Sequence, residues 1–134
     1  MTALKGYPLA DLRILDPQGG DHLDLVVELP NTNAAMSDGL MNVRHLSDGY
    51  GMLFDLGHSS RTAFWMKDTL IPLDIAFWDD LGQIVDIQQM KPCAADPCTQ
   101  YRPSAFYTSA LEVNLGLFER HGVRVGDQVK LTQR

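Results

Sequence analysis

The feature that most constrains the fold is a hydrophobic period of two residues. In residues 22–29, Leu23, Leu25, Val27 and Leu29 recur at every second position, and most of the residues between them are polar. Successive side chains of a β-strand point to opposite faces of a sheet, whereas an α-helix repeats every 3.6 residues. The pattern therefore predicts a strand with one face buried and one face polar.

The same period returns along the rest of the chain, separated by short turns. The clearest hairpin joins residues 73–78 to residues 83–88 through an Asp/Gly turn at residues 79–82. Helix signals are few: Thr32 can cap a short helix over residues 33–38 that ends at Gly39, and residues 114–121 can form another that ends at Gly122. Further strands are expected at residues 11–15, 50–56, 109–113 and 128–132. We therefore expect a mainly β protein, an antiparallel β-sandwich or barrel with one or two short helices.

Chain length and net charge limit the classes of function that this protein can have. The chain has 134 residues, which fits a single domain over residues 1–134. Seventeen acidic residues against 11 basic ones give a net charge of −6, which argues against partners that are nucleic acids or anionic membrane surfaces. No apolar run approaches the roughly 20 residues of a membrane span. The composition predicts an acidic, soluble globular domain whose oligomeric state stays open.

The two cysteines, Cys93 and Cys98, are separated by four residues in a proline-rich stretch. This spacing is neither the redox Cys-x-x-Cys motif nor half of a zinc site with a second pair. Pro92 and Pro97 can turn the loop so that the two sulfur atoms meet, and the sequence leaves open either a disulfide or two free thiols. The four histidines lack metal-ligand spacing and the methionines suit core packing, so we expect no metal and no cofactor.

Enzyme motifs are mostly absent, because the chain contains no glycine-rich phosphate loop, no G-x-S-x-G elbow and no H-E-x-x-H zinc motif. The densest mixture of apolar and charged residues is residues 64–77. There Trp65 could supply an apolar floor, with Lys67 and Asp74 as polar contacts of a pocket. The alternative is a solvated strand face or an ion pair of Asp74 with Lys67 or Arg61. Glu112, between two apolar residues, is a second candidate carboxylate.

Several sequence blocks, in order and with matching spacing, resemble the family called domain of unknown function 192. The resemblance covers residues 23–129 and leaves residues 1–10 as an N-terminal extension. It implies a single mainly β domain with no established activity, so no catalytic residue is carried over. The blocks are Gly39-Leu-Met41, Gly51-Met-Leu-Phe54, Phe64-Trp-Met-Lys67, Thr69-Leu-Ile-Pro-Leu-Asp-Ile75, Gly82-Gln-Ile-Val85, Leu111-Glu-Val113 and Gly126-Asp127.

Two positions depart from the family pattern. The family usually places an arginine two residues after Gly-Leu-Met, where this chain has Val43, and Arg44 follows one position later. The usual Lys-Asn-Thr is replaced by a Lys-Asp-Thr sequence that contains Asp68. Because many relatives are exported, the resemblance and the cysteine pair favour a periplasmic or secreted location over the cytoplasm.

These observations lead to three functional hypotheses. The first is a non-enzymatic binding module for a small ligand or a protein partner, with Trp65, Lys67, Asp74, Arg44 and Glu112 as the candidate binding residues. The second is a hydrolase or lyase that uses Asp74 or Glu112 as a general base. The third is a structural or interaction domain whose motifs only build the core. We favour the first, and no residue is assigned a catalytic role.

Overall fold

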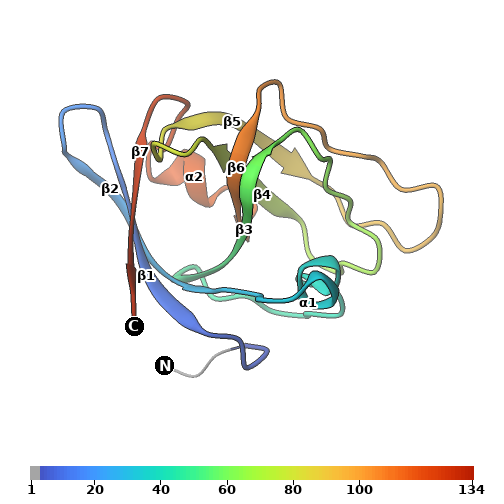
Figure 1. The fold of residues 1–134 in the computed structure, drawn as a ribbon. Coiled ribbons are helices and arrows are strands. Elements are labelled where there is room, and N and C mark those ends of the chain that lie inside the picture. The colour runs from blue at the N-terminus through green and yellow to red at the C-terminus, as the bar shows by residue number, and fades with distance from the viewer. Residues whose placement is uncertain (1–3) are drawn as a thin grey trace.

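The computed structural model describes residues 4–134, which form a mainly β fold (Figure 1). Two short helices accompany the strands: α1, Asn33–Asp38, and α2, Leu117–Arg120. Neither helix of the described residues is long and apolar enough to cross a membrane. The first three residues of the expected N-terminal extension lie outside the described part, and Leu9 and Ala10 already belong to the first strand. The strands are β1 Leu9–Leu15, β2 Asp21–Glu28, β3 Tyr50–Ser60, β4 Leu73–Trp78, β5 Ile84–Met90, β6 Tyr107–Asn114 and β7 Gln128–Gln133.

The strands form one mixed sheet in the order β5-β4-β6-β3-β2-β1-β7. Every pairing within it is antiparallel except that of β2 with β3, which is parallel, so the expected antiparallel arrangement holds only in part. The edge strands come together at one point, where Gln83 bridges Gln128 and Gly82 accepts a hydrogen bond from the backbone of Val129. The sheet is not closed, and the expected sandwich or barrel is therefore not confirmed.

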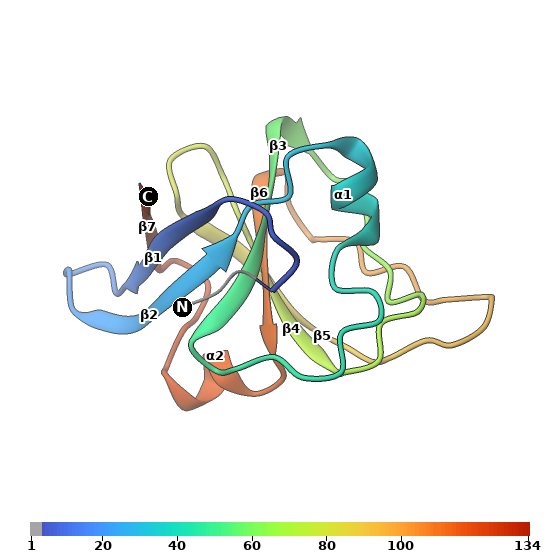
Figure 2. The same cartoon turned by 90° about the horizontal axis from the view of Figure 1, so that it is seen from below.

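The sheet separates two hydrophobic cores. The first core receives buried side chains from all seven strands and from α2, because the sheet curls around it (Figure 2). The second core lies on the other face of the central strands β3, β4 and β6. There the segment that follows α1 contributes Leu40, Val43 and Leu46, and the loop after β3 contributes Met66. Both faces of the central strands are thus covered, which explains why all six residues of β4 are buried.

Local chemistry accounts for the ends of the elements. The Thr32 hydroxyl accepts a hydrogen bond from the backbone of Ala35, as expected of the residue that caps α1. Helix α2 is shorter than the expected 114–121, because Asn114 is still part of β6 and Gly116 adopts a φ of 88°. Such a positive φ is available to glycine at little cost, so the chain turns there before the helix begins.

Strands β3 and β6 approach each other closely at Gly51. A Cβ atom at this position would lie 2.9 Å from the carbonyl oxygen of Glu112 and 2.9 Å from Cδ1 of Leu111. The carbonyl oxygen belongs to the backbone of the paired strand, so it cannot move aside in the way that the end of a flexible side chain can. The Gly51-Met-Leu-Phe54 block therefore places a glycine where the sheet has no room for a side chain.

We predict that Gly51→Ala lowers the free energy of unfolding by about 1–3 kcal/mol, the usual cost of overpacking. Gly49→Ala is the matched control, because a Cβ there meets nothing within 4 Å. It should change stability by less than about 0.5 kcal/mol. Urea unfolding of both variants measures the difference, and equal stabilities would contradict the close approach.

Candidate functional site

The candidate carboxylates Asp74 and Glu112 lie on opposite faces of the sheet. In the register of β4 with β6, Asp74 is opposite Val113, and Ile75 is opposite Glu112. Because side chains alternate along a strand, Asp74 points with Val113 toward the first core, and Glu112 points with Ile75 toward the second. The two residues therefore cannot act together at one site.

Asp74 has a structural role at the start of α2. Its side chain is buried, with 2% of its surface exposed, and its Oδ2 atom accepts hydrogen bonds from the backbone N–H groups of Gly116 and Phe118 at 3.0 and 3.3 Å. Burial raises the pKa of Asp74, and the two backbone hydrogen bonds oppose that rise. The carboxylate thus satisfies donors that the turn into α2 leaves without intrahelical partners.

Glu112 is the candidate carboxylate on the second-core face of the sheet. Only 5% of its surface is exposed, and within residues 4–134 its carboxyl group has neither a hydrogen bond nor an ion pair. Burial alone raises the pKa of Glu112 to about 8, because the ionised form loses its hydration without gaining a partner. At neutral pH the residue is therefore mostly a neutral carboxylic acid that can donate a hydrogen bond.

Glu112 lines a cavity of about 630 Å³ on the second-core face of the sheet. Helix α1 and residues 39–41 form one side of the cavity, and β3 and residues 62–65 form another. Its size is within the range of roughly 300–1,000 Å³ that is usual for small-molecule sites. Gly39 lets the end of α1 approach the cavity wall, because a Cβ there would lie 3.3 Å from the Phe54 ring.

Aromatic side chains form much of the cavity wall. Phe54 and Phe64 make an edge-to-face pair with ring centres 5.2 Å apart, and Phe77 packs against Phe64 and Tyr107. The Tyr107 hydroxyl donates a hydrogen bond of 2.7 Å to the carbonyl oxygen of Thr62, and burial raises the pKa of Tyr107 to about 12. The wall thus combines an apolar surface with a tyrosine whose hydroxyl is already engaged.

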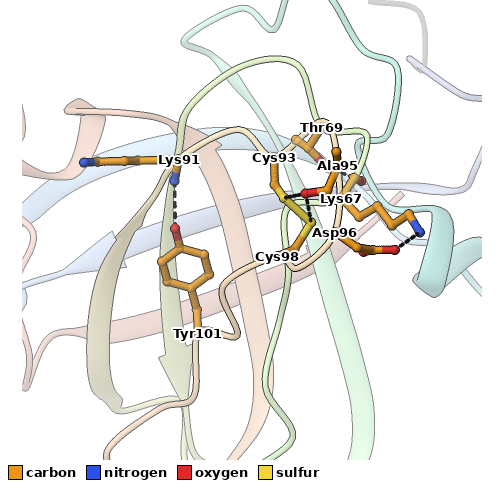
Figure 3. Close-up of a disulfide and its surroundings, with 8 residues drawn as sticks. All are labelled: Lys67, Thr69, Lys91, Cys93, Ala95, Asp96, Cys98 and Tyr101. Atoms are coloured by element: carbon orange, nitrogen blue, oxygen red, sulfur yellow. Dashed lines mark hydrogen bonds and ion pairs between the residues drawn. A yellow bond between two sulfur atoms is a disulfide. The ribbon is translucent and has the colours of Figure 1, made fainter.

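Trp65 and Lys67 lie together, apart from Asp74. Trp65 lines the cavity with 46% of its surface exposed, and Lys67 Nζ lies 5.5 Å from the centre of its ring. The Lys67 ammonium also forms an ion pair of 3.1 Å with Asp96 (Figure 3). Arg44 is exposed and does not line the cavity. The structure therefore brings together Trp65 and Lys67, and places Glu112 deeper in the same cavity as Trp65.

A disulfide between Cys93 and Cys98 closes the loop that carries Asp96, with the two Cα atoms 5.8 Å apart. This loop pairs with the strand-like segment beside Trp65. Cys93 donates its backbone N–H to the carbonyl of Met66, and Asp68 donates to the carbonyl of Cys93. The loop therefore supports the segment that forms the rim of the cavity.

The departure from Lys-Asn-Thr is explained by the backbone at Asp68, which has a φ of 56°. Among residues with a Cβ, asparagine and aspartate adopt this left-handed conformation most readily. Asp68 thus keeps the conformation that an asparagine would favour there. Its neighbour Thr69 is buried and lines the cavity.

Sequence reasoning missed the α1 side of the cavity, where Met36, Asp38 and Leu40 line it. In the sequence, the Thr32 cap and the Gly39-Leu-Met41 block predicted the short helix, but they did not indicate which part of the sheet it packs against. Within residues 4–134, no group of three or more histidine, cysteine, aspartate or glutamate residues is arranged to hold a metal ion.

The family model of domain of unknown function 192 (DUF192), described as "Uncharacterized ACR", matches residues 14–131. A crystal structure of a putative transcription regulator from Sinorhizobium meliloti 1021 superposes with a TM-score of 0.85 at 32% identity, over 93% of this chain and 95% of that one. A protein of unknown function from Novosphingobium aromaticivorans DSM 12444 gives a TM-score of 0.83 at 28% identity, over 97% and 90% of the two chains. No curated protein matches the chain.

We predict that Trp65→Ala costs less than about 1 kcal/mol of stability, because nearly half of the side chain is already in solvent. Phe77→Ala is the contrasting variant. Its ring is fully buried in the second core, and the change should cost about 3–5 kcal/mol. Chemical denaturation of the two variants decides the matter, and a large loss for Trp65→Ala would show that the indole is part of the core.

Glu112 should make the protein less stable as the pH rises. Below pH 4.5, the ordinary pKa of a glutamate side chain, Glu112 is protonated in both the folded and the unfolded state. Between pH 4.5 and about 8 the unfolded chain releases the proton while the folded protein keeps it. The contribution of Glu112 to the unfolding free energy therefore falls by up to about 1.4 kcal/mol per pH unit and is lost as the pH passes its folded-state pKa.

In Glu112→Gln this decline should disappear, so the variant gains stability relative to the wild type as the pH rises from 5 to 8. Glu119→Gln, which changes an exposed acid on α2, should keep the wild-type slope. Urea unfolding at a series of pH values measures both. Parallel profiles for the wild type and Glu112→Gln would show that Glu112 ionises normally in the folded protein.

Proposed function

The chain belongs to the uncharacterised DUF192 family, and we propose that it is a non-enzymatic binding module that holds a small organic ligand in the cavity lined by Trp65 and Glu112. The single observation that carries this proposal is the Glu112 carboxyl, which is buried, faces the cavity and has no partner among the described residues. A buried polar group without a partner is costly. A ligand that binds there would remove this cost.

The surroundings of Glu112 support a small ligand. The cavity is lined by aromatic and aliphatic side chains and by polar residues that include Thr69 and Glu112. Apolar walls combined with placed polar groups are typical of sites that bind small molecules and fix their orientation. A purely structural role accounts for the packed aromatic rings, but it does not account for an unpaired acid beside an open cavity.

A second candidate, an acid–base enzyme, is favoured by the same residue. A carboxyl whose pKa is raised to about 8 by burial is suited to proton transfer near neutral pH. Asp74 is the weaker choice for this role, because its Oδ2 atom is engaged by the turn into α2. In this alternative, Glu112→Gln abolishes turnover of the compound that binds in the cavity and leaves its binding intact.

The disulfide supports a location outside the cytoplasm. Disulfides persist in oxidising compartments such as the periplasm and are rare in reducing ones. The pairing of Cys93 with Cys98 is consistent with a protein that works in the periplasm or is secreted.

Thermal unfolding against a panel of small organic compounds tests the proposed function. A ligand at 100 times its Kd adds about 2.7 kcal/mol of stability, which raises the Tm of a chain of this size by several degrees. We expect at least one compound to do so in the wild type, and Trp65→Ala and Glu112→Gln to reduce the shift.

Arg44→Ala is the matched control, because Arg44 is exposed outside the cavity and its loss should leave the shift unchanged. The binding proposal fails if no compound stabilises the wild type, or if both cavity variants respond as the wild type does.

A further inference from the structure

The charged groups that line the cavity are acidic. Among the described residues these are Asp38, Asp55 and Glu112, and neither lysine nor arginine contributes to the lining. His58 is the remaining basic side chain in the lining. An anionic ligand would thus find no lysine or arginine side chain in the lining to bind its charge.

The three acids differ in how they are compensated. Asp38 forms an ion pair of 2.5 Å with Lys5, and the exposed Asp55 accepts a hydrogen bond of 3.0 Å from the backbone of Gly57. Glu112 has no such partner in residues 4–134. The Lys67 ammonium is paired with Asp96 and does not line the cavity. The uncompensated acid of the cavity is therefore Glu112.

The walls beside this acid suit a positive charge. Phe54, Phe64, Trp65 and Tyr107 all line the cavity. Aromatic rings attract cations to their faces, and sites that bind ammonium groups commonly combine several rings with a carboxylate. The Lys67 ammonium above Trp65 shows that this ring already accepts a cation on one side.

Resting on the proposed function, we infer that the ligand is an organic cation, an ammonium group on an apolar body, which pairs with the Glu112 carboxylate between the aromatic walls. The apolar body occupies the part of the cavity lined by Met36 and Leu56. A neutral ligand of the same shape would make the apolar contacts but would form no ion pair with the Glu112 carboxylate.

Binding of a cation must move a proton. At neutral pH the Glu112 side chain is mostly a carboxylic acid, because burial raises its pKa to about 8. When the ammonium group enters, Glu112 ionises and its proton passes to the buffer, so the total charge is conserved. The apparent affinity equals the intrinsic affinity multiplied by the ionised fraction, which rises about tenfold from pH 6 to pH 7 and changes little above pH 9.

The other charged and titratable groups around Glu112 must be separated from it as sources of the pH dependence of cation binding. On β4 the side chains that face the second core are Leu73, Ile75 and Phe77, which carry no charge. On β3, Asp55 and His58 line the cavity, and on α1 Asp38 is paired. On β6, Tyr107 has its pKa raised to about 12. His58 is therefore the group that must be removed in a control.

The experiment is isothermal titration of the full chain with benzyltrimethylammonium chloride from pH 6 to pH 10. This cation has no proton of its own to lose. We expect its affinity to rise about tenfold between pH 6 and pH 7 and less than about twofold between pH 9 and pH 10. At pH 7, titrations in buffers of different ionisation enthalpy should show the release of nearly one proton per bound cation.

Charge selectivity is measured at pH 8 with three compounds of similar shape: 2-phenylethylammonium, 2-phenylethanol and 3-phenylpropanoate. The cation should bind at least about tenfold more tightly than the alcohol, and the carboxylate should bind most weakly. Glu112→Gln should remove the preference and the proton release, whereas Glu119→Gln and His58→Asn should keep both. The pH series on the wild type tests the inference even if Glu112→Gln does not fold.

The outcomes separate the two proposals. If neutral or anionic compounds stabilise the protein and both cations do not bind, the inference is overturned and the binding function stands. Cation binding that is independent of pH and unchanged in Glu112→Gln also overturns the inference. If nothing in the wider panel binds, both the inference and the proposed function fail.

Discussion

The fold depends on the pairing of β6 between β3 and β4 in the middle of the sheet. This strand contributes alternate side chains to two cores, with Leu111 and Val113 in the first and Ala110 in the second. The pairing is close enough that β3 has a glycine, Gly51, opposite it. Because both faces of the strand are covered, every side chain in its centre must be compatible with a dry environment. Glu112 is the one that is not.

The cost of burying Glu112 is the strongest indication that the cavity has a use. An ionised carboxylate without a partner would be far more expensive in this position than a neutral one, so the raised pKa is the way in which the folded protein limits the cost. A methionine would fill a similar space without burying a polar group that lacks a partner. In Asp74, by contrast, the Oδ2 atom accepts two backbone hydrogen bonds that explain why this carboxylate is buried. Glu112 has none among the described residues, and it opens onto space that a ligand can fill.

The two-residue period predicted the strands well, because a sheet that is buried on one face imposes that period on its sequence. It failed to group the site residues, for a reason that is visible at Trp65, Lys67 and Asp74. Residues 61–70 are not a regular strand but an irregular segment with isolated bridges, and Asp68 has a positive φ. The alternation that begins at Leu73 therefore cannot be extended backwards to Trp65. Nearness in the sequence grouped Asp74 with a tryptophan that lies at the cavity on the other face.

The sequence indicates which face of the sheet Glu112 lies on, but it does not indicate what covers that face. Alternation places Glu112 opposite to Leu111 and Val113, and in a sheet with one buried face that would mean solvent. The positions of α1 and of residues 62–65 turn that second face into a cavity. These elements are set by contacts far apart in the sequence, such as the backbone pairing of Met66 with Cys93. The same covering that removes water from Glu112 brings aromatic rings beside it. The desolvation that weakens the folded protein at alkaline pH thus also strengthens any charge–charge interaction inside the cavity.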